Sequence, residues 1–86
     1  MHLEKVLIVD DEKLVRWSLR QKCQEWGYAV MEAADGASGI RAAHNELPDL
    51  VLLDVRLPDM SGLDVLQDIK QNTCARAVPA EDSGGK

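Results

Sequence analysis

The residues best suited to chemistry in this sequence are three aspartates: Asp10 and Asp11, which are adjacent, and Asp54. They directly follow two short apolar runs, at residues 5–9 and 50–53, that are typical of buried strands. If these strands are parallel neighbours about 4.8 Å apart, their carboxyl ends meet at one edge of a sheet, and the three carboxylates can surround one small volume. Carboxylates this close repel one another until a cation is bound.

Such a cluster predicts a magnesium site. Mg²⁺ prefers oxygen ligands, takes one or two carboxylates and keeps several waters. A bound Mg²⁺ can also hold a phosphoryl oxygen while a carboxylate attacks phosphorus, so that one aspartate is the nucleophile and the others hold the metal. A purely structural interpretation stays open, because acidic residues at the start of a helix complement its dipole without any further function.

The elements that must position these aspartates alternate between strands and helices. Strands are predicted at residues 5–9, 28–31 and 50–53, and helices at residues 12–26, 37–47 and 61–70. In the helical segments apolar residues recur at the spacing of one helix face, as in the stripe formed by Val15, Leu19, Cys23 and Trp26. Because parallel strands need right-handed helical crossovers, the order predicts an α/β fold with a doubly wound parallel sheet and three α/β/α layers.

Composition limits the partners and the location of the chain. Its 86 residues suit one small domain, and 15 acidic against 10 basic residues give a net charge of −5. This charge argues against direct contact of the chain with nucleic acid or an anionic membrane. Cys23 and Cys74 lack the spacing of a metal or redox motif, and no signal peptide or membrane-spanning run is evident. We therefore predict a cytoplasmic protein.

Three stretches of the sequence resemble the receiver domain of two-component response regulators. They are "VLIVDDE" at 6–12, "GYAVMEAADGASGI" at 27–40 and "DLVLLDVRLPDMSGLDVLQDIK" at 49–70. The resemblance implies a flavodoxin-like fold with strand order 2-1-3. The shorter stretch "RWSL" at 16–19 is similar to NtrC-like transcriptional regulators, which carry an ATPase module and a helix-turn-helix DNA reader.

The resemblance also assigns roles to individual residues. It implies that Asp54 is the phosphoacceptor and that its phosphoryl group comes from a histidine kinase. It implies that Asp11 binds Mg²⁺ directly, that Asp10 does so through water or polar contacts, and that the backbone carbonyl of Arg56 completes the protein's share of the metal shell.

The end of the chain departs from the family pattern. Receiver domains have a fourth strand ending in Ser or Thr and a fifth ending in Lys, and both residues contact the phosphoryl group. The segment "NTCARAVPAEDSGGK" has neither strand pattern, so Ser83 and Lys86 are not assigned these roles. We therefore predict a partial receiver domain at residues 1–72, truncated after the third βα unit, and a loop-like or disordered tail at residues 73–86.

Truncation at this point would leave the strand at residues 50–53 as an open apolar edge, which invites pairing with another chain. The sequence thus predicts a homo-oligomer, such as a dimer, assembled through this edge. Two alternatives to a phosphorylatable receiver remain. One is a receiver remnant that binds partners without efficient phosphotransfer. The other is a magnesium-dependent phosphatase, but that class has Asp-x-Asp where this chain has adjacent aspartates, so we predict that the chain is not an enzyme.

Overall fold

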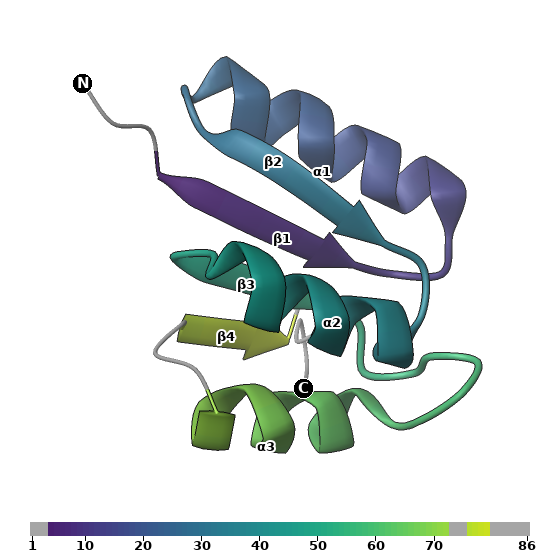
Figure 1. Ribbon diagram of the computed structural model, residues 1–86. Coiled ribbons are helices and arrows are strands. Elements are labelled where there is room, and N and C mark those ends of the chain that lie inside the picture. Colours follow the sequence, from purple (N-terminus) through teal and green to yellow (C-terminus); the bar gives the residue numbers. More distant parts are fainter. Residues whose placement is uncertain (1–3, 73–75, 80–86) are drawn as a thin grey trace.

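The computed structural model describes residues 4–72 and 76–79, which form a four-stranded parallel sheet and three helices (Figure 1). In chain order the elements are β1 (Lys5–Val9), α1 (Lys13–Glu25), β2 (Ala29–Ala33), α2 (Gly36–Glu46), β3 (Leu50–Leu53), α3 (Gly62–Asn72) and β4 (Arg76–Pro79). The sheet order is β2-β1-β3-β4, with parallel pairing throughout. The predicted doubly wound α/β fold and the 2-1-3 order of its first three strands are confirmed.

Helices cover both faces of the sheet, and each face has its own apolar cluster. α2 and α3 pack against one face, where Leu7 and Val9 of β1 are fully buried. α1 covers the other face, where Val6 and Ile8 are buried against Cys23. Because β1 is central and buried on both faces, it is apolar at every position except Lys5, as a central parallel strand requires.

α1 is less buried than its apolar stripe predicts. Of that stripe only Cys23 is buried, whereas Val15 is 40% exposed and Trp26 is 67% exposed. Leu14 and Trp17 are also exposed, at 75% and 58%. The physical reason is that α1 is the one helix on its face within residues 4–72, so its outward positions have no neighbouring helix to pack against.

The fourth strand overturns the predicted end of the fold. Residues 76–79, assigned above to a loop-like tail, pair in parallel with β3, with Leu50 opposite Arg76 and Leu53 opposite Pro79. The expectation of an open edge at β3 was therefore wrong, because β4 of the same chain takes up this pairing position. The predicted homo-oligomer loses the open edge from which it was inferred, and assembly of the chain stays a prediction. Ser83 and Lys86, to which the sequence analysis assigned no contact with the phosphoryl group, lie outside the described residues.

The sequence signal for β4 was too weak because the strand is short and ends in proline. "RAVP" has four residues, too few to show the periodicity of a strand. Proline lacks the backbone N–H that a central strand needs, but it is tolerated on an outermost strand. The strand forms here because α3 returns the chain to the side of β3, where parallel pairing is available. No helix in the described part of the chain is long and apolar enough to cross a membrane.

Candidate functional site

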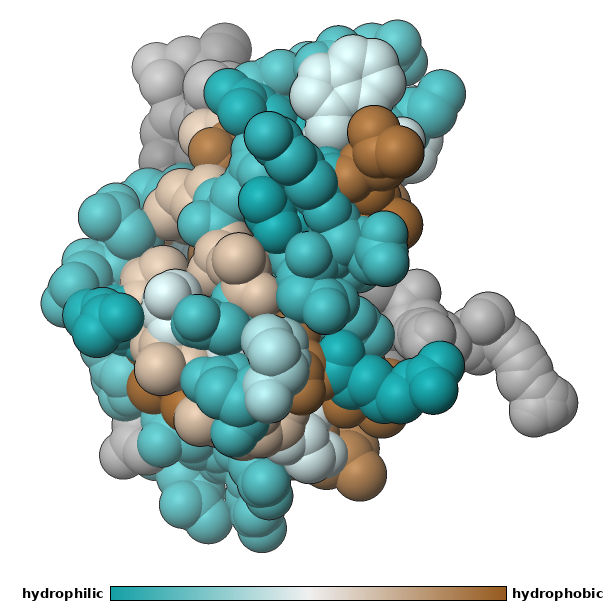
Figure 2. Space-filling model, turned by 90° about the vertical axis from the view of Figure 1, so that its right-hand side faces the viewer, coloured by the Kyte–Doolittle hydropathy of each residue, from teal (hydrophilic) through white to brown (hydrophobic). Residues whose placement is uncertain are grey.

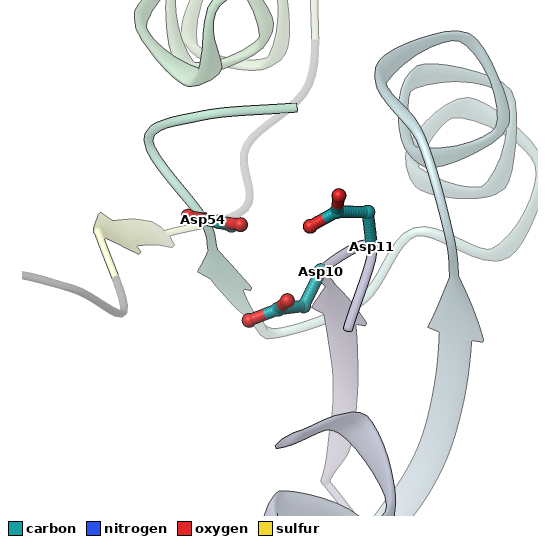
Figure 3. A group of neighbouring side chains, drawn as sticks. All are labelled: Asp10, Asp11 and Asp54. Atoms are coloured by element: carbon teal, nitrogen blue, oxygen red, sulfur yellow. The ribbon is translucent and has the colours of Figure 1, made fainter. Parts of the chain in front are cut away.

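The three aspartates singled out in the sequence come together at the carboxyl ends of β1 and β3 (Figure 3). Asp10 and Asp11 follow β1, and Asp54 follows β3. These strands are neighbours, and the Asp54 backbone N–H donates to the Val9 carbonyl at 2.8 Å. One carboxylate oxygen of each aspartate lies within 4.8 Å of the others. Figure 2 faces this end of the strands and shows a mostly hydrophilic surface.

The three carboxylates differ in their surroundings. Asp10 is buried, with 7% of its surface exposed, whereas Asp54 is half-buried and Asp11 is exposed. Burial raises the pKa of Asp10, and the nearby charges of Asp54, Asp11 and Glu12 act in the same direction. A hydrogen bond from the Glu12 backbone N–H to Oδ1 of Asp10, at 2.9 Å, opposes this rise. A cation at the cluster would therefore relieve an unfavourable buried charge.

Arg16 of α1 holds the end of β1, a contact that the sequence analysis missed. Its Nη1 donates to the Asp10 backbone carbonyl at 2.8 Å, and its Nε donates to Glu32 at 3.1 Å. Arg20, one turn later, also pairs with Glu32, at 2.8 Å. The sequence indicates these contacts only through the spacing of Arg16 and Arg20 along one helix face. Their partners can be identified only from the fold.

A closed loop follows Asp54 and places Arg56 beside it. The Arg56 backbone N–H donates to Oδ1 of Asp54 at 3.2 Å, and Arg56 also forms an antiparallel bridge with Ser61. At the base of the loop the Gly62 N–H donates to the Val55 carbonyl at 2.7 Å. A Cβ at Gly62 would overlap the Asp54 carbonyl and lie 2.7 Å from Val55 Cα, so this close approach requires glycine. The predicted role of the Arg56 carbonyl as a metal ligand stays a prediction.

The donor set fits a hard divalent cation. All three side chains offer oxygen, and oxygen-only sites suit Mg²⁺. An octahedral Mg²⁺ holds its ligands about 2.1 Å away, so ligands on opposite sides lie about 4.2 Å apart. The 4.8 Å spread of the three oxygens is close to this span. Small side-chain movements and retained waters would complete the shell, with Asp10, Asp11 and Asp54 holding the ion.

Comparison with known proteins agrees with the fold and shows the family of the chain. The family model of the response regulator receiver domain matches residues 6–79. The probable transcriptional regulatory protein TcrX of Mycobacterium tuberculosis is 46% identical over 65 residues, which cover 76% of this chain and 28% of that protein. Sporulation initiation phosphotransferase F of Bacillus subtilis is 40% identical over 67 residues, which cover 78% of this chain and 54% of that protein. The chain thus spans from under a third to about half of these curated relatives.

Solved structures show the same similarity. The response regulator TrrA of Thermotoga maritima in complex with Mg²⁺-BeF superposes with a TM-score of 0.86 at 32% identity, covering 90% of this chain and 68% of that one. The same regulator in complex with the histidine kinase ThkA gives a TM-score of 0.81 at 33% identity, covering 87% and 66%. Because the family model matches most of the chain, the protein belongs to the response regulator receiver domain family.

Proposed function

We propose that this chain is a phosphorylatable signalling receiver, in which Asp54 accepts a phosphoryl group from a histidine kinase. The observation that carries the proposal is the convergence of three carboxylates at the carboxyl ends of β1 and β3. TrrA, a similar structure, was solved both with Mg²⁺-BeF and with a histidine kinase. Both complexes are those of TrrA, and they support the same metal and the same class of partner for this chain.

In the proposed step, a carboxylate oxygen of Asp54 attacks the phosphorus of a phosphohistidine on the kinase. The new P–O bond forms an acyl phosphate as the P–N bond breaks, and the released imidazole nitrogen takes up a proton. The Arg56 N–H orients Oδ1 of Asp54, so we assign the attack to Oδ2. Mg²⁺, when bound, would offset the charge of the phosphoryl oxygens. Asp10, Asp11 and the Arg56 carbonyl would hold it beside Asp54.

The second candidate is a receiver that binds partners without efficient phosphotransfer. One observation favours it: β4 ends at Pro79, and the next residue in the sequence is Ala80, which has no hydroxyl. The family resemblance calls for Ser or Thr at the end of the fourth strand. We therefore expect phosphorylation of Asp54 to occur at a reduced rate, because an alanine cannot supply the hydroxyl contact that the family resemblance implies at this position of the sequence.

The output and the location are also proposals. TcrX is named a probable transcriptional regulatory protein, and it is much longer than this chain. We propose that this receiver controls transcription through a further domain or partner, because its net charge of −5 does not favour DNA contact by the chain itself. We also propose a cytoplasmic location, because a receiver must meet the kinase that phosphorylates it.

Incubation with a small phosphodonor and Mg²⁺, followed by intact mass measurement, tests the proposal. We expect the mass of one phosphoryl group to be added to the wild-type chain and not to Asp54→Asn. Asp64→Asn is the matched control, because Asp64 is an exposed aspartate in the first turn of α3. Labelling of Asp54→Asn at the wild-type rate would place the phosphoacceptor elsewhere. Failure to label the wild type at all would favour the binding module.

A further inference from the structure

The loop between β3 and α3 is fixed at its tip as well as at its base. The tip is held by Asp59, whose Oδ1 accepts a hydrogen bond from the Gly36 N–H at 2.8 Å and whose Oδ2 accepts one from the Ala37 N–H at 3.0 Å. These are the first two residues of α2, and they lie 23 and 22 positions from Asp59 in the sequence. Both oxygens of the Asp59 carboxylate thus accept hydrogen bonds from α2, a helix that does not border this loop in the sequence.

This arrangement satisfies groups that the helix cannot satisfy itself. The first N–H groups of an α-helix have no partner within the helix, and they form the positive end of its dipole. Asp35, the residue before α2, accepts a hydrogen bond from the Ser38 N–H at 2.8 Å. Asp35 and Asp59 therefore share the free N–H groups of the first turn. The two bonds from α2 hold the pKa of the Asp59 carboxyl below its ordinary value, so Asp59 is charged at neutral pH.

Close packing supports the same contact. A Cβ at Gly36 would lie 2.7 Å from Met60 Sδ and 3.1 Å from Oδ1 of Asp59, so the loop rests directly on the backbone of α2. α2 in turn rests on the end of β1, because a Cβ at Gly39 would lie 2.9 Å from the methyl groups of Val9. Val9 directly precedes Asp10. The same helix therefore contacts β1 beside the acidic cluster and the tip of the loop that carries Asp54 and Arg56.

We propose that Asp59 is a positioning residue for phosphotransfer, which fixes the loop so that Asp54 and the Arg56 carbonyl face the metal and phosphoryl sites. The inference rests on the proposed function above. Loss of the two Asp59 hydrogen bonds would leave the tip of the loop held by the packing of Met60 alone, so the loop would move more and Asp54 would sample orientations away from Asp10. Misplacement of a reacting group by about 1 Å can slow a reaction about 100-fold. With the base intact, we expect Asp59→Ala to slow labelling of Asp54 about tenfold.

The test compares the labelling rates of wild type, Asp59→Ala, Asp59→Asn and Asp64→Ala over a range of Mg²⁺ concentrations. Asp59→Ala should label slowly and need more Mg²⁺ for half-maximal rate. Asp59→Asn should recover part of the rate, because the amide oxygen can still accept one of the two bonds. Asp64→Ala removes the same charge from an exposed site and should stay within about twofold of wild type, since surface charges have small effects.

A second readout separates this inference from the proposed function. The amide NMR signal of Arg56 reports the hydrogen bond to Asp54, and the amide signals of Gly36 and Ala37 report the bonds to Asp59. In Asp59→Ala all three should shift or broaden without Mg²⁺ or phosphodonor. If the wild type is not labelled, the proposed function fails, and the Arg56 signal alone decides the positioning role. An unchanged Arg56 signal, or equal slowing in Asp64→Ala, would overturn the inference.

Discussion

Replacing Asp10 with asparagine should stabilise the metal-free protein, although Asp10 lies in the site itself. Asp10 is buried beside two other carboxylates, with oxygens within 4.8 Å of one another. Two unit charges at that distance repel by about 0.9 kcal/mol even in a water-like dielectric. Asp10 faces two such partners, so removing its charge should raise the free energy of unfolding by roughly 1–2 kcal/mol. The asparagine oxygen can still accept the Glu12 N–H, so that bond need not be lost.

The assay is a pair of thermal melts, one with a chelator and one with Mg²⁺. For a domain of this size, 1 kcal/mol shifts the midpoint by about 4–8 °C, so metal-free Asp10→Asn should melt clearly above wild type. Mg²⁺ at ten times its dissociation constant should stabilise wild type by about 1.4 kcal/mol and Asp10→Asn by much less. The control is Asp64→Asn, which removes the same charge from an exposed position. Asp49→Asn is less suitable, because the Asp49 carboxylate accepts a hydrogen bond from the Lys5 N–H. Metal-free Asp10→Asn melting below wild type, or an equal Mg²⁺ effect in both proteins, would show that repulsion between the Asp10 charge and its neighbours does not destabilise the metal-free fold.

Three further predictions follow from single contacts. Gly62→Ala should lower the free energy of unfolding by roughly 2–4 kcal/mol in urea titrations, because its Cβ would overlap the backbone of Asp54 and Val55; a loss under 0.5 kcal/mol would contradict this. Arg16→Ala should lower the free energy of unfolding by about 1–2 kcal/mol and weaken Mg²⁺ binding, because the Asp10 carbonyl loses its hydrogen-bond donor. Equal losses of stability and Mg²⁺ affinity in Arg20→Ala would show that only the pairing with Glu32, which both arginines share, matters. The hydrogen bonds from α2 lower the pKa of Asp59 in the folded state, so Asp59 stabilises the fold at pH values above its unfolded pKa of about 3.9. This stabilisation is lost as the pH falls toward the folded pKa, so the free energy of unfolding of Asp59→Asn should fall less steeply with decreasing pH than that of wild type. The same dependence on pH in both proteins would count against the two bonds to α2.

The parts of the fold that the sequence predicted are those with a local, repeated signal. "KVLIV" and "LVLL" are continuous apolar runs, and each is followed by aspartate, so both the strands and the convergence of their ends could be inferred. β4 could not, because four residues ending in Pro79 carry no periodicity and pair only when α3 has returned the chain. The exposure of Trp26 was also missed, because an apolar stripe does not tell how many helices share its face of the sheet.

The contacts that organise the site were harder to predict than the site itself. Asp59 appears in the sequence as one acidic residue in a turn, and its partners in α2 are 22 and 23 residues away. Arg16 binds a backbone carbonyl, a group present in every residue and therefore without a sequence signature. Such contacts depend on how elements meet in space, whereas the three carboxylates of the acidic cluster could be predicted from their chemistry and from their place at strand ends.

We propose that Asp54 accepts a phosphoryl group with the help of a metal held by its neighbours. This proposal is tested by phosphodonor labelling of wild type and Asp11→Ala, each with Mg²⁺ and with a chelator, followed by peptide mapping of the modified residue. Asp11 is exposed, so its removal should leave the fold intact while the metal site loses one of its three carboxylates. We expect one phosphoryl group on Asp54 of the wild type, only with Mg²⁺, and little or none on Asp11→Ala. Equal labelling in chelator, or a phosphoryl group mapped to another residue, would contradict it.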